Sequence, residues 1–149
     1  MKITIDFGHP YFEENVLLGL TPDDLNCFYA DASEVDRLNL FFVLEASLHR
    51  FQGEERMKTA AYCAFLMAYY LFIALTPPAS FELAEFYIDR ALEWDETPEY
   101  RQWKAIIEKL MNLNRQTNRW CPPRARYPAM FRKTEESQAA FAAWLSSVI

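Results

Sequence analysis

Apolar residues recur with helical spacing along most of the chain. The clearest stripe lies in residues 33–53, where Phe41, Leu44, Leu48 and Phe51 stand at positions i, i+3, i+7 and i+10 of one helix face. Capping residues precede such stripes and glycine or proline follows them, a pattern that predicts an all-α helical bundle of six or seven helices. The helices are expected at residues 10–18, from Thr21 onward, and at 33–53, 54–75, 81–94, 97–113 and 134–148.

The ends and inner faces of these helices follow from local signals. Thr21 is expected to cap a helix with proline at its first position, and Ser33 and Ser80 are expected to cap two others. Thr76-Pro77-Pro78 ends the helix at 54–75, because proline cannot continue a helix. The inward positions are predicted to be Leu83, Tyr87, Ala91 and Trp94 in residues 81–94, Trp103, Ile107, Leu110 and Leu113 in residues 97–113, and Phe141, Trp144, Leu145 and Val148 in residues 134–148.

One helix is apolar on every side. No charge occurs between Lys58 and Glu82, and residues 60–75 form an uninterrupted apolar run. A membrane span needs about 20 such residues, and this shorter run ends at prolines and has no strong basic cluster beside it. We therefore predict the central core helix of the bundle, with Leu66, Tyr70 and Ile73 buried, and no membrane association.

Residues 2–7 show a different period. Ile3, Ile5 and Phe7 alternate with polar residues, which predicts a short strand. An isolated strand cannot satisfy its own backbone groups, so it would have to pair with a short segment or with another copy of the chain.

Length and composition narrow the class of protein. The chain has 149 residues, of which 52% are hydrophobic, so we expect one helical domain over residues 1–149. Three glycines leave little material for a Walker loop or a dinucleotide fingerprint. No catalytic signature is present, and the sequence predicts a protein that is not an enzyme and that has no cofactor.

Charge divides the chain into two parts. Residues 1–100 carry 18 acidic and 6 basic residues, whereas residues 101–149 carry 3 acidic and 9 basic residues. Residues 114–133 contain no acid and break the helical period, which predicts a long basic loop; loops of this length are often functional. The candidate partner-binding residues of this segment are Arg115, Arg119, Trp120, Arg124, Arg126, Tyr127 and Arg132.

A stripe of acidic residues has the opposite charge to this loop. Glu85, Asp89 and Glu96 recur along one predicted helix, and we expect the basic segment to lie across them, within one chain or between two. The overall charge of −6 and the lack of a continuous basic stripe argue against nucleic-acid binding, since such binding depends on neutralising phosphates.

The cysteines, the histidines and the paired acids are expected to have structural roles. Three cysteines without a C-x-x-C pair argue against a disulfide framework and a zinc site; together with the lack of a signal peptide they favour the cytoplasm. Cys63 is expected to be a buried, inert thiol, and Cys121 has no nearby histidine to activate it. His49 and Glu45 form one pair on a helix face, short of a metal site. Glu54-Glu55 and Glu135-Glu136 are interpreted as acids at helix starts.

One segment carries a resemblance to a known family. The residues concerned are Ala84, Ile88, Ala91, Leu92, Glu93, Trp94 and Asp95. Their spacing resembles the second helix of a tetratricopeptide repeat, and the resemblance extends over about residues 64–114, a third of the chain. Pro98 stands two positions after the family's terminal proline, and Met67-Ala68 replaces its Leu-Gly. The resemblance implies a helical hairpin that binds protein or peptide.

Two functions are compatible with these observations. The first is a small cytoplasmic helical protein that acts by binding another protein or itself as a homodimer. The alternative is a nucleic-acid-interacting protein or an enzyme whose site is built from residues 115–133.

Overall fold

A computed structural model describes residues 1–117, which form an all-α helical bundle, as predicted. Within these residues there are six α-helices and one π-helical segment. They are α1 (Glu14–Gly19), α2 (Pro22–Asp31), α3 (Glu34–Gly53), α4 (Met57–Tyr69), the π-helical segment η1 (Tyr70–Leu75), α5 (Ser80–Trp94) and α6 (Pro98–Thr117). The helix predicted at 134–148 lies outside the described residues.

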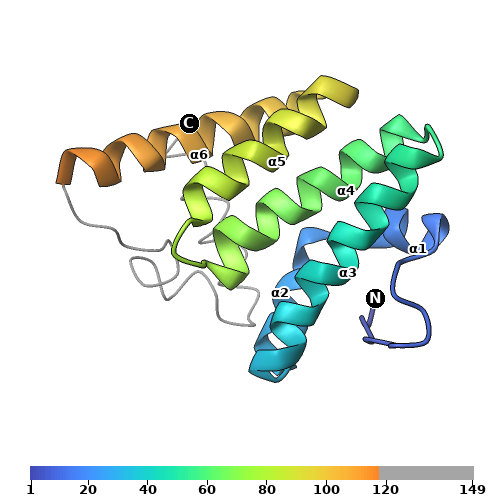
Figure 1. Cartoon of the computed structure of the whole chain (residues 1–149). Coiled ribbons are helices and arrows are strands. Elements are labelled where there is room, and N and C mark those ends of the chain that lie inside the picture. Colours follow the sequence, from blue (N-terminus) through green and yellow to red (C-terminus); the bar gives the residue numbers. More distant parts are fainter. Residues whose placement is uncertain (118–149) are drawn as a thin grey trace.

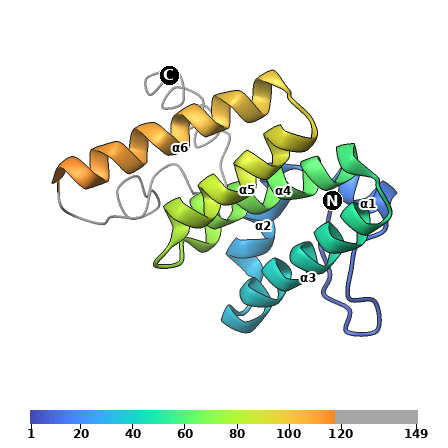
Figure 2. The ribbon, with the colours of Figure 1, turned by 45° about the horizontal axis from the view of Figure 1, so that its top comes forward.

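The four longer helices run back and forth beside one another. Each of α4, α5 and α6 is antiparallel to the helix before it, so α3 and α5 point in the same direction on either side of α4 (Figure 1). Helices α1 and α2 lie on the side of this array that is formed by α3 and α4 (Figure 2). There α1 contacts α4, and α2 contacts η1. Helix α4 is thus the centre of the bundle.

Helix α4 and η1 make up the core, as their apolar sequence predicts. Leu66, Tyr70 and Ile73 are all fully buried, which confirms the prediction for this helix. Residues Met57–Leu75 form the one helix within residues 1–117 that is long and apolar enough to cross a membrane, but 83% of its most apolar window is buried inside the protein. Such burial is consistent with the core helix of a soluble protein.

Small side chains let the central helices approach closely. Ala60, Ala64 and Ala68 recur on α4, Ala84 and Ala91 recur on α5, and all five are buried. A helix face of small residues reduces the distance between two helix axes. Helix α5 is accordingly the helix that α4 contacts most extensively.

The predicted caps are partly confirmed. Thr21 Oγ1 accepts a hydrogen bond from the Asp24 amide, and the Asp24 carboxylate accepts one from the Thr21 amide, so α2 begins with a full capping box. Ser33 Oγ likewise accepts a hydrogen bond from the Asp36 amide at 3.2 Å. The cap predicted at Ser80 is wrong. Ser80 is the first residue of α5 and is buried, and Ala79 precedes it without a side-chain cap.

The turn between α3 and α4 differs from the prediction. Glu54 caps the end of α3 and Glu55 has a φ of 60°, so neither carboxylate lies in the first turn of a helix as predicted. A residue in the left-handed region commonly ends a helix. Helix α3 ends at Gly53, as predicted, but α4 begins at Met57 rather than at residue 54. Glu54 instead pairs with Arg50 on one side, at 3.1 Å, and with Arg56 on the other, at 3.3 Å.

The core helix ends in an unusual conformation. Its last six residues form a π-helix, and the amide of Thr76 donates to the carbonyl of Leu71, five residues earlier, at 3.1 Å. Thr76 itself has φ 46° and ψ 55°, a left-handed conformation that is strained for a β-branched residue. Pro77 follows, and its ring disfavours the ordinary helical conformation for the residue before it. Thr76 therefore holds strain at the point where the helix must stop.

Replacing Thr76 by glycine is expected to raise the free energy of unfolding by about 1 kcal/mol, because glycine adopts this conformation without steric cost. Urea denaturation measures the change. Thr76→Ala is the matched control, since it keeps a Cβ and should recover little of the gain. An equal gain from both variants, or a loss from Thr76→Gly, would contradict the assignment of strain to this residue.

The predicted N-terminal strand is wrong. Residues 1–117 contain no strand, and residues 2–7 have irregular backbone. Ile3 is buried and Ile5 packs against the core, whereas Phe7 is 83% exposed. The alternation therefore places two isoleucines against helices, and a turn begins where the Asp6 carboxylate accepts a hydrogen bond from the Gly8 amide. Side-chain packing, rather than a backbone ladder, holds this segment.

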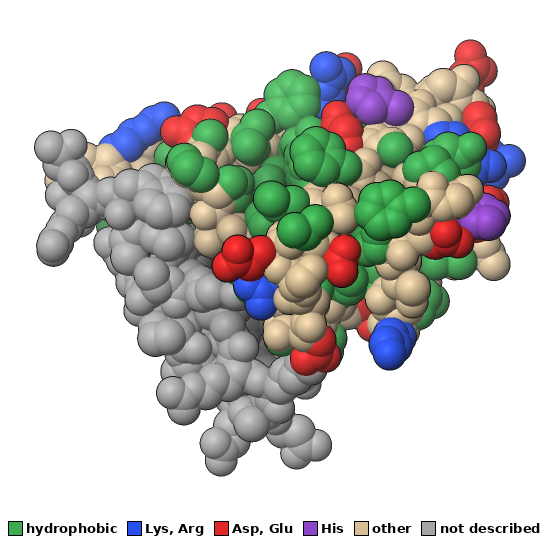
Figure 3. Space-filling view, turned by 60° about the horizontal axis from the view of Figure 1, so that its bottom comes forward, with side chains coloured by type: hydrophobic (Ala, Val, Ile, Leu, Met, Phe, Trp, Pro, Cys, Tyr) green, Lys and Arg blue, Asp and Glu red, His purple; other side chains and the backbone are tan. Residues whose placement is uncertain are grey.

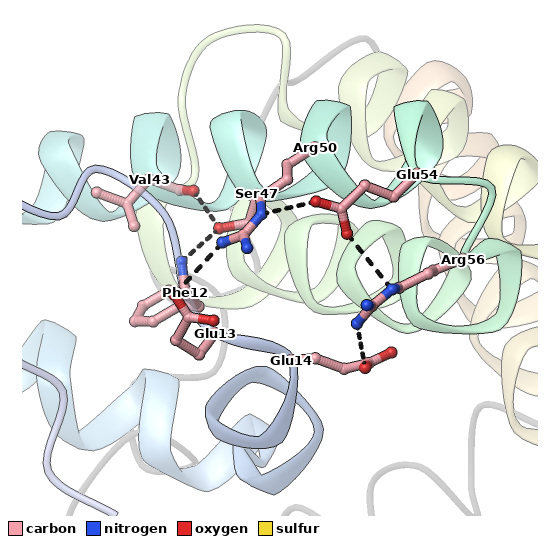
Figure 4. Close-up of polar contacts among 8 residues, drawn as sticks. All are labelled: Phe12, Glu13, Glu14, Val43, Ser47, Arg50, Glu54 and Arg56. Atoms are coloured by element: carbon pink, nitrogen blue, oxygen red, sulfur yellow. Dashed lines mark hydrogen bonds and ion pairs between the residues drawn. The ribbon is translucent and has the colours of Figure 1, made fainter.

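Polar contacts fix the segment that leads into α1 (Figure 4). Ser47 Oγ, on α3, accepts a hydrogen bond from the Phe12 amide at 2.9 Å and donates one to the Val43 carbonyl at 2.7 Å. Arg50 lies 3.4 Å from Glu13, and Arg56 pairs with Glu14 at 2.5 Å. The Phe12 amide is thus engaged with α3. Helix α1 begins at Glu14, four residues later than the predicted start at residue 10.

Candidate interaction surface

Of the predicted partner-binding residues, the structure describes only Arg115. It is exposed in the last turn of α6, and its Nη2 lies 3.6 Å from the sulfur of Met111. The other six lie outside the described residues, as does Cys121. They are Arg119, Trp120, Arg124, Arg126, Tyr127 and Arg132.

The start of the predicted basic loop is also corrected. Helix α6 continues to Thr117, so residues 114–117 are helical. Asn114 interrupts the apolar pattern, but it is buried on the same face as Ile107, Leu110 and Met111, which extends that face by one turn. Leu113, which was predicted to point inward, is 38% exposed.

The acidic stripe, which follows α5 and the turn after it, is partly neutralised by the next helix. Asp89 accepts a hydrogen bond from Lys104 of α6 at 2.6 Å, and Glu96 pairs with Arg101. The hydrogen bond to Asp89 is the main reason why the pKa of Lys104 lies above its usual value. Two of the three acids that were expected to meet the basic segment 115–133 therefore have partners on α6, and only Glu85 makes no ion pair within the described part of the chain.

Helix α3 carries a second apolar stripe that faces water. Val35, Leu38 and Phe42 stand at i, i+3 and i+7, and they are 67%, 52% and 64% exposed. The buried face of the same helix is formed by Leu40, Leu44, Leu48 and Phe51. Because the two stripes lie on different sides of the helix, α3 is apolar toward the core and also toward solvent.

Helix α5 also carries two apolar residues that are exposed to water. Leu83 and Phe86, at i and i+3, are 36% and 50% exposed. The prediction that Leu83 points inward is wrong, because the buried face of α5 is centred on Ala84, Ile88 and Ala91. These residues face α4 in place of Leu83, which turns the Leu83 side chain toward solvent.

Aromatic rings connect the two stripes. On α3, the ring centroids of Phe41 and Phe42 lie 5.6 Å apart. On α5, those of Phe86 and Tyr87 lie 5.1 Å apart. Phe41 and Tyr87 join the two helices with centroids 6.3 Å apart, edge to face. We use the name α3–α5 surface for Val35, Leu38, Phe42, Leu83 and Phe86, with Phe41 and Tyr87 as its floor.

The floor is fixed by a hydrogen-bonded chain. The Tyr87 hydroxyl donates to one carboxylate oxygen of Glu45 at 2.5 Å, and His49 Nε2 lies 3.0 Å from the other. Burial, followed by the hydrogen bond to Glu45, raises the pKa of Tyr87 above its usual value. The predicted pairing of His49 with Glu45 is confirmed, and its structural result is to hold Tyr87 in place.

Charged groups border the α3–α5 surface. Glu34, Glu82 and Glu85 each precede a surface residue by one position in the sequence. The nearest base on α5 is Arg90, whose guanidinium lies 5.3 Å from the centroid of the Phe86 ring and which pairs with Glu93 at 3.7 Å. Figure 3 shows hydrophobic side chains gathered on one face of the protein, with acidic side chains between and beside them.

Other candidate chemistry is sparse in the described part. No group of three or more His, Cys, Asp or Glu residues in residues 1–117 could hold a metal ion. His9 contacts Asp6 at 2.9 Å on the exposed N-terminal turn. Cys63 is fully buried, as predicted, and its thiol donates to the Leu44 carbonyl at 3.3 Å. The most prominent feature of residues 1–117 is the exposed apolar α3–α5 surface.

This surface was not predicted from the sequence, although the sequence holds a signal for it. Val35, Leu38 and Phe42 have the same helical spacing as a core stripe, and α3 has more apolar positions than one buried face requires. Comparison of the chain with family models, curated proteins and solved structures gives no match.

Proposed function

We propose that this protein acts by binding another protein through the α3–α5 surface, and that its role is binding rather than catalysis. The observation that carries the proposal is the exposure of five large apolar side chains in two neighbouring stripes. Together they expose on the order of several hundred Å², the size of the largest apolar patch on a monomer, which is often functional. When a partner covers apolar area of this kind, the area is removed from water, which favours the complex.

The aromatic content of the surface supports the same proposal. Phe42 and Phe86 are exposed, and they rest on Phe41 and Tyr87. Aromatic side chains are enriched at protein interfaces, and rings already held in place lose little conformational freedom on binding.

Charge supports a protein partner over a nucleic acid. Residues 1–117 carry 19 acidic and 10 basic residues, a net charge of −9, which opposes phosphate binding. The alternative, a nucleic-acid or catalytic site in residues 115–133, rests on the sequence alone.

Two expectations from the sequence belong to this proposal. We place the protein in the cytoplasm because Cys27 and Cys63 are both free thiols, which suits a reducing compartment. The tetratricopeptide resemblance of residues 64–114 remains a prediction. It supports a binding role, and the buried Ala84 and Ala91 are compatible with the close helix packing that it implies.

The test compares variants of the surface in the native host. Phe42→Ser combined with Phe86→Ser removes both exposed rings, and Phe7→Ser is the matched control, since Phe7 is also exposed but lies on the N-terminal turn. We expect a partner whose recovery with the double variant falls at least about tenfold and whose recovery with the control is unchanged, because interface aromatics often contribute more than about 1.4 kcal/mol. Quantitative mass spectrometry of co-purified proteins measures recovery.

Direct binding then checks the result. The recovered partner, purified separately, should bind the wild type and the Phe7→Ser variant with equal Kd and the double variant more weakly. Circular dichroism and thermal unfolding establish that all three proteins are folded. Equal recovery of every co-purified protein with all three would overturn the proposal.

A further inference from the structure

We infer that the partner segment that fits the α3–α5 surface is an amphipathic helix with lysine or arginine beside its apolar face. This inference rests on the proposed function and adds the chemistry of the partner. It follows from the direction of the two helices, the fixed floor between them and the charge at the border.

The geometry favours a helix. Helices α3 and α5 run in the same direction (Figures 1 and 2). One of the two exposed apolar stripes lies on each of these helices. From Val35 to Phe42 the stripe extends about 10 Å along the helix axis, or two turns. A third helix lying along both stripes can place anchors at i, i+3 or i+4 and i+7 against them, as helix-in-groove recognition requires. An extended peptide lacks a sheet edge to pair with in residues 1–117, which contain no strand.

The floor is ready to receive such a helix. The Phe41 and Tyr87 rings are in contact, and the hydrogen bond from the Tyr87 hydroxyl to the Glu45 carboxylate fixes the Tyr87 ring. A partner side chain that inserts between the stripes therefore meets rings that need no reordering. Such preorganisation lowers the entropic cost of binding.

The border charge selects a basic partner. Glu34, Glu82 and Glu85 make no ion pair with any base among residues 1–117. Lys104 is near enough to Glu85 for its pKa to respond, but its hydrogen bond goes to Asp89. Lysine or arginine on a partner helix would face these carboxylates.

A second copy of this chain is a poorer occupant. In a two-fold contact through this surface, each copy would bring the same acidic border to the interface. Like charges placed opposite one another oppose association. The structure therefore favours a partner of different sequence over a homodimer at this site.

The chain's own C-terminal residues are also a poorer fit. The helix predicted at 134–148 has an apolar face, but residues 134–149 contain two acids and no base. Residues 115–133 are basic, but Pro122, Pro123 and Pro128 interrupt any amphipathic helix there. Neither segment combines the two properties that the surface selects.

The test uses three synthetic peptides with the full-length protein. Each has about 18 residues, roughly five helical turns. The first has leucine and phenylalanine at i, i+3, i+4 and i+7 with lysine at polar positions; the second has glutamate in place of lysine; the third keeps the lysines with serine in place of the apolar anchors. We expect the first to bind at least about tenfold more tightly than either of the others, measured by fluorescence anisotropy.

Variants of the protein separate the two contributions. Phe42→Ser with Phe86→Ser should weaken binding of the lysine peptide at least about tenfold, whereas Phe7→Ser should leave it unchanged. Glu82→Lys with Glu85→Lys should reduce the preference for lysine over glutamate about three- to tenfold, because each exposed pair contributes little alone. Equal affinity for the lysine and glutamate peptides would overturn the inferred charge, and equal affinity for the lysine and serine peptides would overturn the apolar anchors.

A photo-crosslinking amino acid at Leu83 identifies the occupant. Crosslinks to the added lysine peptide support the inference. Crosslinks of the isolated protein to residues 118–149 of the same chain, or to a second copy, would overturn it in favour of those occupants. Failure of all three peptides to bind, with the partner still lost on changing Phe42 and Phe86, would overturn the helical partner while leaving the proposed function standing.

Discussion

Replacing Leu66 by alanine is expected to lower the free energy of unfolding by about 2 to 5 kcal/mol. Leu66 is fully buried at the centre of α4, the helix that contacts α1, α3 and α5. The shorter side chain loses its favourable transfer from water and leaves a cavity, which the surrounding helices can fill only in part. Urea denaturation followed by circular dichroism measures the change.

Leu18→Ala is the matched control for this prediction. Leu18 lies on α1 and is 52% exposed, so the same chemical change should cost less than about 1 kcal/mol there. A loss of under 0.5 kcal/mol for Leu66→Ala, roughly the effect of an ordinary surface substitution, would contradict its place in the core.

The thiol of Cys63 is expected to react with an alkylating reagent at least about a thousandfold more slowly than that of Cys27. Cys63 is fully buried, whereas Cys27 is exposed. Burial, and to a smaller extent the charge of Glu45, raises the pKa of Cys63, so little of the reactive thiolate is present. Reaction then requires opening of the protein, which for a stability of about 5 kcal/mol is populated less than about one part in a thousand.

Mass spectrometry of peptides after timed alkylation measures both rates in one sample. The two predictions are also coupled. If Leu66→Ala lowers stability by about 2 kcal/mol, Cys63 should react roughly 30-fold faster in that variant while Cys27 is unaffected. Reaction of Cys63 at the rate of Cys27 in the wild type would show that α4 is open to solvent.

The helices were predictable because their signals are local. Thr21 and Ser33 cap helices whatever surrounds them, and Pro77 stops a helix by steric exclusion alone. The apolar run in α4 predicted its burial because no face of that helix could be turned to water. Features of this kind need no knowledge of the tertiary structure.

The wrong predictions concern features that depend on neighbours. The alternation at Ile3 and Ile5 is the same for a strand as for an irregular segment packed on helices, and only the absence of a partner strand in residues 1–117 separates the two. Either Leu83 or Ala84 could lie on the inner face of α5. The small Ala84 lies there because α4 packs closely against α5. Sequence periodicity cannot resolve a choice between adjacent residues that packing distance decides.

The candidate site was hidden for a related reason. Apolar residues at Val35, Leu38 and Phe42 suggest burial to any method that reads hydrophobicity alone. They are exposed because α4 covers the other face of α3. The composition of the basic segment is unusual and can be recognised in the sequence. The α3–α5 surface consists of apolar residues of the kinds that are common in protein cores, so its composition does not distinguish it.

The back-and-forth order of the helices also bears on how quickly the protein folds. Helices α3, α4 and α5 contact their neighbours along the chain, so few residues separate the contacting segments and closing each loop costs little chain entropy. Helical proteins dominated by such local contacts fold within microseconds to milliseconds. Helix α2 instead meets η1, and Asn26 donates to the Tyr69 hydroxyl 43 residues away. We expect α2 to dock late, so that the α3–α5 surface is complete before the amino-terminal segment is anchored.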